Sequence, residues 1–267
     1  MSKPPPARTN RSALGSLGRH VRDWFIHAFP LEMRTASGLT VRLRNRSELA
    51  VYRNIFVERV YPFDTFAREI GANPAPVVLD VGANNGQFAA AVFDYWPQAH
   101  VHSFEPQTHL VPRIREFAAM NGLQDQLTVN WCAIGASAGE ADFYQNRSPI
   151  SASLLREKAA RRSIRRVYKV PVKTLDDYAQ AQGLRQVDIL KLDVEGVELD
   201  AMRGARQVLA GVRLIFLEVH PPFSTFSQAA ALLKSSGLTC VNPVKTPDDV
   251  DQANCVFARR ADATPSS

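Results

Sequence analysis

Short apolar runs alternate with stretches of helical periodicity from residue 76 to near the end of the chain. The runs that predict buried strands are 77–82, 100–105, 127–135, 187–194, 212–219, 238–241 and 254–258. The helices predicted between them are 87–95, 108–121, 197–209 and 226–236. Apolar strands separated by helices indicate a parallel, doubly wound α/β sheet with helices on both faces. Such sheets bind ligands at the carboxyl ends of their strands.

The first 75 residues follow a different pattern. Residues 1–12 are rich in Pro, Arg, Ser and Asn and predict a disordered arm. Between residues 12 and 29, apolar side chains recur at three- and four-residue steps, which predicts an amphipathic helix. We expect its apolar stripe to pack on the main domain, with an anionic membrane surface as the alternative. Further elements are predicted at 40–43, a strand, and at 48–70, a helix broken by Pro62.

Composition and charge exclude several classes of protein. With 45% hydrophobic and 22% charged residues among 267, the chain is not largely disordered, collagen-like or coiled-coil. Its net charge of +6 is a local effect, because residues 1–60 and residues 156–173 each carry +7 and the remainder carries −8. The main body is therefore acidic, and a DNA-binding face across the whole domain is disfavoured.

Targeting signals and paired cysteines are missing from the sequence as given. The apolar runs fall short of the roughly 18 residues that a membrane span needs. The first ten residues have no apolar core of the kind found in signal peptides. The three cysteines, Cys132, Cys240 and Cys255, have no C-x-x-C spacing, so we expect reduced thiols, no zinc site and a cytoplasmic protein.

The turn after the first predicted strand carries candidate ligand-binding residues. Gly82 and Gly86 are spaced G-x-x-x-G, which is neither the dinucleotide fingerprint nor a P-loop. Gly82 allows a close approach to the backbone, and the carboxylate of Asp80 suits a cationic ligand such as S-adenosylmethionine. Glu105, at the end of the second strand, stands where ribose hydroxyls are bound in nucleoside-binding sheets. Together these residues favour an adenosine-containing cofactor over a structural turn and a capping acid.

The motifs DVGANNGQF, SFEP, Ala133-Ile134-Gly135 and KLDVEGVE together resemble the FkbM-type methyltransferase family, over about residues 40–258. The resemblance implies a seven-strand Rossmann-like sheet with an antiparallel last strand, and S-adenosylmethionine-dependent methyl transfer, usually to a hydroxyl. By position, it implies a cofactor loop of Asp80, Gly82, Ala83, Asn84 and Gly86, with Glu105 on the ribose. Cys132 and Ala133 would flank the adenine, and Asp193 would also contact the cofactor.

This resemblance sets the expected domain organisation. An arm and amphipathic helix (1–38) are followed by a lead-in (39–75) that covers the active site, with Arg42 and Arg44 helping to close it. The S-adenosylmethionine-dependent methyltransferase domain (76–260) and a disordered tail (261–267) complete the chain.

Acidic and basic side chains gather at the ends of the fourth and fifth strands. Asp193 and Glu195 share a period of two with Lys191, as Glu218 does with His220, so each set projects to one side. They could act as a general base, with His220 the natural candidate, or hold a divalent cation that lowers the pKa of the acceptor. No ligand spacing demands a metal, so the base is favoured.

Three of the residues in and around this cluster have alternative interpretations. Glu198, and less so Glu195, could merely complement the dipole of the following helix. Lys191 could simply neutralise its carboxylate neighbours.

Two further segments bear on the acceptor. Residues 220–223, His-Pro-Pro-Phe, predict a rigid turn, with Phe223 lining the acceptor pocket, and not a motif for methylating amino groups of bases. The basic stretch 156–173 is expected to border the acceptor side, where it either holds an anionic acceptor or forms a solvated helical face. Its one aromatic residue, Tyr168, is a poor platform for base stacking, which disfavours nucleic acid.

The sequence therefore predicts an S-adenosylmethionine-dependent O-methyltransferase acting on a saccharide, a glycolipid or a secondary metabolite. An RNA methyltransferase and a non-catalytic, peripheral anion-binding module are the alternatives. The oligomeric state is left open.

Overall fold

The computed structural model describes residues 30–146, 152–161, 163–242 and 253–259. The amphipathic helix predicted at 12–29 and the tail predicted at 261–267 lie outside these ranges. Within them, no helix is long and apolar enough to cross a membrane.

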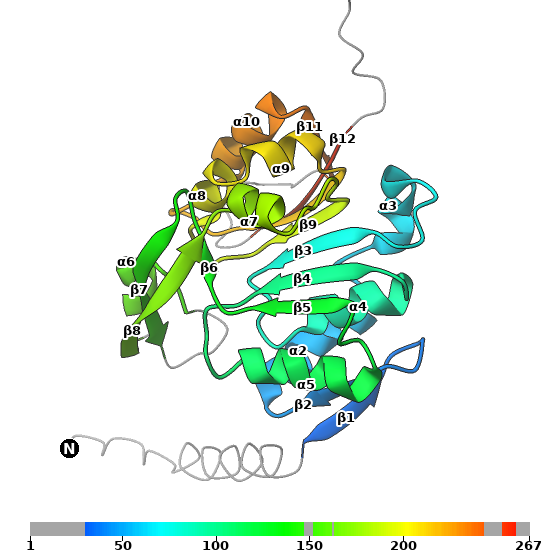
Figure 1. The fold of residues 1–267 in the computed structure, drawn as a ribbon. Coiled ribbons are helices and arrows are strands. Elements are labelled where there is room, and N and C mark those ends of the chain that lie inside the picture. The colour runs from blue at the N-terminus through cyan, green and yellow to red at the C-terminus, as the bar shows by residue number, and fades with distance from the viewer. Residues whose placement is uncertain (1–29, 147–151, 162, 243–252, 260–267) are drawn as a thin grey trace, which may run out of the picture.

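The described residues form a seven-stranded central sheet with the order β11-β12-β10-β9-β3-β4-β5 (Figure 1). Its strands are β3 (Val77–Val81), β4 (His100–Phe104), β5 (Leu127–Asn130), β9 (Ile189–Leu192), β10 (Leu214–Val219), β11 (Leu238–Asn242) and β12 (Ala253–Arg259). From β10 to β5 all neighbours run parallel, whereas β12 runs antiparallel to β10 and β11. The predicted Rossmann-like sheet with an antiparallel last strand is confirmed.

Helices cover both faces of the sheet (Figure 1). One face carries α4 (Gln87–Tyr95) and α5 (Val111–Asn121), and the other carries α7 (Leu175–Ala181), α8 (Glu198–Arg203), α9 (Arg206–Gly211) and α10 (Phe226–Ser235). Successive strand residues alternate between these cores: Val78 and Ile189 pack on one side, and Leu79 and Leu190 on the other. Burial on both faces explains why the strands are apolar throughout.

The lead-in is packed against the first of these faces. It comprises β1 (Leu31–Arg34), β2 (Thr40–Leu43), α2 (Arg46–Tyr52), the π-helix η1 (Arg53–Val57) and α3 (Phe63–Ile70). Glu48 of α2 is buried and accepts hydrogen bonds from Arg113 of α5 at 2.7 and 2.5 Å. Gln87, at the start of α4, donates to the carbonyl oxygen of Glu48 at 3.0 Å. These contacts hold the lead-in beside the loop that follows β3.

The segment between β5 and β9 differs from its prediction. It contains β6 (Ala133–Ile134), β7 (Gly139–Asn146), α6 (Arg156–Ala160) and β8 (Ile164–Lys173), with a three-stranded sheet of order β6-β8-β7. The strand predicted at 127–135 is therefore two short strands in different sheets. The basic stretch is mostly strand and not a helical face, because β8 pairs with β7 along its length, as in Asp142 opposite Lys169.

The helix predicted at 197–209 is also divided, into α8 and α9. The break falls at Gly204, where an added Cβ would lie 2.1 Å from the carbonyl oxygen of Gly135. Close packing of two backbones therefore interrupts the helix.

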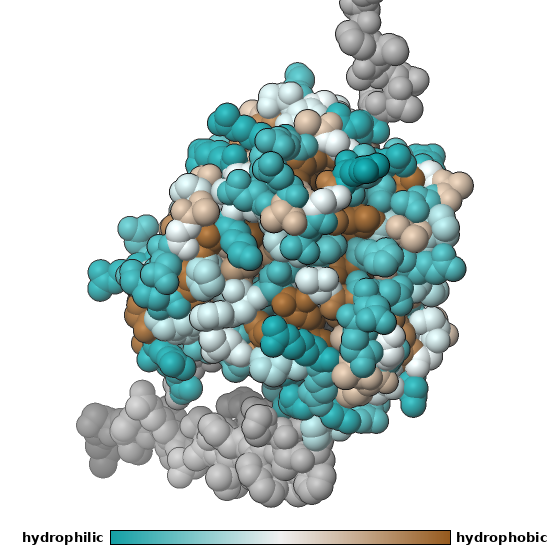
Figure 2. Space-filling view, viewed as in Figure 1, coloured by the Kyte–Doolittle hydropathy of each residue, from teal (hydrophilic) through white to brown (hydrophobic). Residues whose placement is uncertain are grey.

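The surface on the side shown in Figure 1 is mostly hydrophilic, with smaller hydrophobic areas between the hydrophilic residues (Figure 2).

Candidate active site

The loop after β3 is shaped by its glycines and by neighbouring strand ends. Gly82 has φ +81°, and a Cβ there would lie 1.8 Å from the carbonyl oxygen of Asp193. The amide groups of Gly82 and Ala83 both donate to the carbonyl oxygen of Phe104 at 3.0 Å. The loop is thus wedged between the ends of β4 and β9, and only glycine fits at its first turn.

Glu105 follows β4 and ties this loop to the next one. Its carboxylate accepts hydrogen bonds from the amide groups of Asn84, at 2.7 Å, and Gln107, at 2.8 Å. Burial raises the pKa of Glu105 to about 7, although these two hydrogen bonds oppose the rise. The side chain of Gln107 hydrogen-bonds the same carboxylate, so of its roughly four lone-pair sites about one remains for a hydroxyl donor of a ligand.

A pocket of about 580 Å³, including its open mouth, adjoins this carboxylate, and we call it the Glu105 pocket. Phe104, Cys132, Ala133 and Ile134 give it an apolar wall. Burial raises the pKa of the Cys132 thiol to about 11, so Cys132 is a neutral wall residue at physiological pH. Asp193 and Glu195 also line the pocket. A ligand with a flat apolar ring and a cationic group would match this lining.

Lys191 of β9 lies beneath the loop with two carboxylates. Its Nζ donates to the carbonyl oxygen of Gly82 at 2.6 Å and lies 3.6 Å from Asp80 and 3.5 Å from Asp193. Burial alone would lower the pKa of Lys191, but the charges of Asp193 and Asp80 outweigh it and raise the pKa. Burial raises the pKa of Asp80, which lines neither this pocket nor the next. Lys191 and Asp80 therefore support the loop from below.

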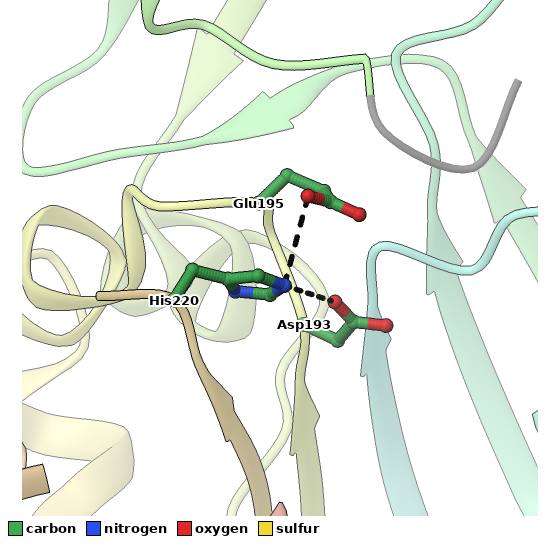
Figure 3. A group of neighbouring side chains, drawn as sticks. All are labelled: Asp193, Glu195 and His220. Carbon is green, nitrogen blue, oxygen red and sulfur yellow. Dashed lines mark ion pairs between the residues drawn. The ribbon is translucent and has the colours of Figure 1, made fainter. Parts of the chain in front are cut away.

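Asp193, Glu195 and His220 form what we call the acid–histidine cluster (Figure 3). Nε2 of His220 lies 3.9 Å from Oδ1 of Asp193 and 3.6 Å from Oε2 of Glu195. Glu218 of β10 lies 4.0 Å from the same nitrogen, and burial raises its pKa to about 9. The predicted convergence of these four side chains occurs. However, β9 ends at Leu192, so a loop and not the strand pleat positions Asp193 and Glu195.

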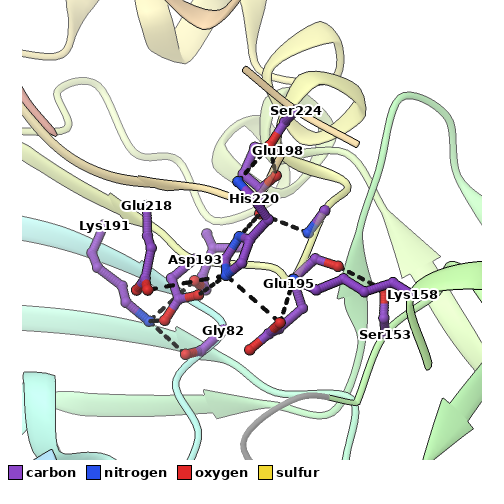
Figure 4. A network of polar contacts seen from close by, with 12 residues as sticks. Gly82, Ser153, Lys158, Lys191, Asp193, Glu195, Glu198, Glu218, His220 and Ser224 are labelled. Atoms are coloured by element: carbon purple, nitrogen blue, oxygen red, sulfur yellow. Dashed lines mark hydrogen bonds and ion pairs between the residues drawn. The ribbon is translucent and has the colours of Figure 1, made fainter. Parts of the chain in front are cut away.

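Glu198 supports His220 from behind the cluster (Figure 4). The Glu198 residue is fully buried, and its Oε1 accepts from Nδ1 of His220 and from the amide of Gly196, both at 2.8 Å. Its other oxygen accepts from the hydroxyl of Ser224. Burial would raise the pKa of Glu198, but the hydrogen bond from His220 outweighs it and lowers the pKa.

Because the carboxylate of Glu198 accepts only, Nδ1 of His220 carries the proton. In the neutral ring, Nε2 then directs its lone pair into the cluster. Burial would lower the pKa of His220, but the hydrogen bond and charge of Glu198 raise it. Sequence reasoning favoured a dipole role for Glu198, since a first-turn acid gives no sign that a distant histidine packs against it.

A second pocket opens on the other side of the cluster, and we call it the His220 pocket. It measures about 1660 Å³ with its mouth included, and Asp193, Glu195, Glu218 and His220 line its floor. Asn54 and Tyr61 come to its wall from the lead-in, and Lys158 and Arg161 from the segment around α6. Lys158 and Arg161 belong to the basic stretch that the sequence predicts at the acceptor side, and Asn54 and Tyr61 belong to the lead-in predicted to cover the site. Neither pattern identifies these four residues individually.

The basic segment and the predicted turn meet at this pocket. Lys158 forms an ion pair with Glu195, and the hydroxyl of Ser153 donates to the carbonyl oxygen of Glu195 at 2.8 Å. The guanidinium of Arg161 lies over the ring of Phe223, 5.0 Å from its centre. Pro221 lines the His220 pocket, whereas Phe223 supports Arg161.

The predicted cofactor-loop residues after β3 have different positions. Gly82 and Asn84 line both pockets, Ala83 lines the His220 pocket, and Gly86 packs on Ile114.

The residues of the Glu105 pocket fit S-adenosylmethionine. The buried carboxylate of Glu105 can accept a hydrogen bond from a ribose hydroxyl, and the apolar wall suits adenine. Asp193, whose pKa is lowered because the charge of Lys191 outweighs burial, offers a negative charge toward the sulfonium end.

Known methyltransferases are similar to this chain in sequence. The chain is 29% identical over 157 residues to the 2-O-methyltransferase NoeI of Sinorhizobium fredii, covering 54% of this chain and 63% of that protein. It is 28% identical over 267 residues to the 31-O-demethyl-FK506 methyltransferase FkbM of Streptomyces tacrolimicus, covering 85% and 96%. A crystal structure of a Methyltransferase FkbM from Methylobacillus flagellatus aligns with a TM-score of 0.44 at 16% identity, covering 69% of this chain and 44% of the other.

The Methyltransferase FkbM domain matches residues 80–251, which span the loop after β3, Glu105 and the acid–histidine cluster. The chain therefore belongs to the FkbM methyltransferase family, whose methyl donor is S-adenosylmethionine.

Proposed function

We propose that the protein transfers the methyl group of S-adenosylmethionine to a hydroxyl oxygen of a saccharide or another small-molecule acceptor. The observation that carries the proposal is the junction of the two pockets: Gly82, Asn84, Asp193 and Glu195 line both. A donor in the Glu105 pocket and an acceptor in the His220 pocket would therefore meet at the acid–histidine cluster. Holding two reactants in line at such a junction is itself a large part of the catalysis.

The chain would hold the cofactor by its two ends. S-adenosylmethionine supplies a methyl group on a positively charged sulfur, which an acceptor oxygen displaces in line. Glu105 accepts a hydrogen bond from a ribose hydroxyl, and Cys132 and Ala133 pack beside the adenine. Asp193 faces the positive end. Asp80 and Lys191 act indirectly, because they hold the backbone of Gly82 in place.

The acceptor hydroxyl must lose its proton at or before methyl transfer. We place this step at His220, with Asp193, Glu195 and Glu218 around it. The lone pair on Nε2 of His220 can serve in two ways: it takes the proton as a general base, or it helps hold a cation that lowers the pKa of the hydroxyl. Either role predicts that His220→Ala slows turnover and spares cofactor binding.

The proposed acceptor has hydroxyl groups and an anionic group. Lys158 and Arg161 lie three residues apart on one side of α6 and line the same pocket. An exposed guanidinium binds carboxylate or phosphate in a bidentate manner. The names of NoeI and of the Streptomyces enzyme place their methyl groups on oxygen, which supports an oxygen acceptor here. A saccharide or a secondary metabolite bearing an acidic group fits this description.

The test has two parts. Calorimetry with S-adenosylmethionine should show binding that Glu105→Ala weakens and His220→Ala spares. A labelled-methyl transfer screen over neutral and acidic glycans, glycolipids, hydroxylated metabolites and RNA should label an oxygen of a small acceptor. No cofactor binding at high micromolar concentration would overturn the proposal. Salt-sensitive labelling of RNA alone would replace it with RNA methylation.

A further inference from the structure

We propose that Asp193, Glu195 and His220 bind a divalent cation on the acceptor side of the site. One ligand atom from each residue, a carboxylate oxygen or a ring nitrogen, lies within 4.8 Å of the others. A carboxylate or imidazole ligand sits roughly 2.0–2.2 Å from a divalent transition-metal ion, so two ligands of one ion are at most about 4.4 Å apart. The distances from His220 to the two carboxylates, 3.6 and 3.9 Å, already meet this limit.

The ring of His220 supplies an independent indication of a ligand. Its residue is only 4% exposed, yet Nε2 has no hydrogen-bond partner among the described residues. A buried polar atom without a partner is costly, and it usually marks a missing ion or water. Nε2 points between Asp193 and Glu195, which is the position an ion would occupy (Figure 3). The atom is therefore aimed into the cluster and not merely near it.

Glu198 completes the arrangement that a metal-binding histidine needs. Such a histidine usually donates its other ring N–H to a carboxylate, which fixes its tautomer and orientation. Nδ1 of His220 lies 2.8 Å from Oε1 of Glu198, and Ser224 and Gly196 donate to that same carboxylate. With these three hydrogen bonds, the carboxylate of Glu198 holds His220 together with the backbone of Gly196 and the hydroxyl of Ser224.

The local charge favours a cation. Within the described residues, the carboxylates of Asp193, Glu195 and Glu198 lie within 4.0 Å of a ring nitrogen of His220. Glu218 lies at 4.0 Å, but because its pKa is about 9 it is protonated near pH 7 and adds no charge. Two lysines oppose the carboxylates: Lys158 forms an ion pair with Oε2 of Glu195, the oxygen 3.6 Å from Nε2 of His220, and Lys191 lies 3.5 Å from Oδ2 of Asp193. Lys191 leaves Oδ1 of Asp193 facing His220. A divalent cation would offset the negative charge that the lysines leave.

The role of the ion depends on the proposed function, although its binding does not. All three ligands line the His220 pocket, so an ion there would have open positions toward the acceptor. An acceptor oxygen bound at such a position has a lower pKa, because the ion stabilises the alkoxide. His220 would then act as a ligand and not as a general base.

The experiment measures Mn²⁺ binding directly, by equilibrium dialysis and by the electron paramagnetic resonance signal of the full-length, chelator-treated protein. We expect one Mn²⁺ per chain, competed by Mg²⁺ or Zn²⁺. His220→Ala and Asp193→Asn should lower the affinity at least tenfold, and Glu198→Gln, which removes the charge behind His220 but keeps the shape of the side chain, should lower it about 10–100-fold. The matched controls are the exposed His100→Ala on β4 and Asp142→Asn on β7, which should bind as the wild type does.

Binding by the wild type decides the proposal even where a variant fails to fold. No stoichiometric binding at millimolar Mn²⁺, or equal binding by a folded His220→Ala protein, would overturn it. Calorimetry with S-adenosylmethionine on the same samples separates the two proposals. Methyl transfer by metal-free protein would exclude a catalytic role for the ion and leave the proposed function standing. Mn²⁺ binding without binding of S-adenosylmethionine would leave the ion site standing and overturn the proposed function.

Discussion

Nδ1 of His220 lies 2.8 Å from a carboxylate oxygen of Glu198, and both side chains are buried. The pair joins the loop after β10 to the first turn of α8, and it determines which ring nitrogen faces the acid–histidine cluster. We expect Glu198 to position His220, whichever chemistry Nε2 performs.

Glu198→Gln tests this relationship. The amide still accepts a hydrogen bond from Nδ1 but carries no charge, so His220 is held less firmly. We expect methyl transfer to fall about 10–100-fold with little change in S-adenosylmethionine affinity. Labelled-methyl transfer and calorimetry measure the two effects. Asp200→Asn, an exposed acid on the same helix that pairs with Arg203, is the control. Parallel loss of cofactor binding would argue for a general structural role.

Gly82→Ala tests the shape of the loop after β3. Its Cβ would clash with the carbonyl oxygen of Asp193, so either the loop or the end of β9 must move. We expect S-adenosylmethionine affinity to fall at least tenfold by calorimetry. Gly122→Ala is the matched control, because Gly122 has a similar φ of +70° with no atom within 4 Å. That change should cost roughly 1–2 kcal/mol of stability and leave cofactor affinity intact.

Lys191→Met removes the cation that lies between Asp80 and Asp193. Breaking a buried ion pair leaves uncompensated charge, so the free energy of unfolding should fall by roughly 3–5 kcal/mol. Denaturant unfolding measures the loss. Lys169→Met removes an exposed lysine paired with Asp142 on the hairpin and should change stability little. Similar stabilities for the two variants would show that Asp80 and Asp193 do not depend on Lys191.

Glu105 gives a pH dependence of cofactor binding. Because its pKa is about 7, protonation converts an acceptor into a donor as the pH falls. If ribose needs the carboxylate, S-adenosylmethionine affinity should fall about tenfold between pH 8 and pH 6. Calorimetry across this range measures it, and Glu105→Gln should bind weakly without this pH dependence. A wild-type affinity that is flat with pH would exclude the ionised form as the binding form.

The same pKa has a consequence for stability. The folded chain holds the proton of Glu105 more tightly than the unfolded chain, in which an ordinary glutamate titrates at about 4.5. This group therefore favours folding most below pH 4.5, and its contribution is lost as the pH rises to about 7. Glu105→Gln should remove that part of the pH dependence of unfolding.

Much of the fold could be predicted from local pattern. The strands at 77–82, 100–105 and 212–219 were expected within one or two residues, because strands buried on both faces are apolar throughout. Predictions failed where pairing between distant segments decides the structure. Residues 156–173 carry charges that suit a helical surface, but most of them form strand β8, which pairs with β7.

The candidate site divides in the same way. Gly82, Glu105, Asp193 and His220 could be chosen because each lies at or next to the end of a predicted strand of a parallel sheet, and such ends share one edge. Tyr61 reaches the same site from the lead-in, and Lys158 and Arg161 reach it from the basic stretch. The sequence predicts both segments near the site but does not identify these individual side chains. The sequence marks Glu198 as a candidate site residue, but it does not reveal that His220 is its hydrogen-bond partner.

The sequence by itself determined the sheet, the edge where the chemistry lies and the family, since these depend on periodicity and on residue types at strand ends. The tertiary structure decided which groups touch. It brought Glu198 to His220, Lys158 to Glu195 and Lys191 beneath Gly82. The physical reason is that burial and long-range packing set the hydrogen bonds and protonation of these side chains, and neither is encoded within a few residues of them.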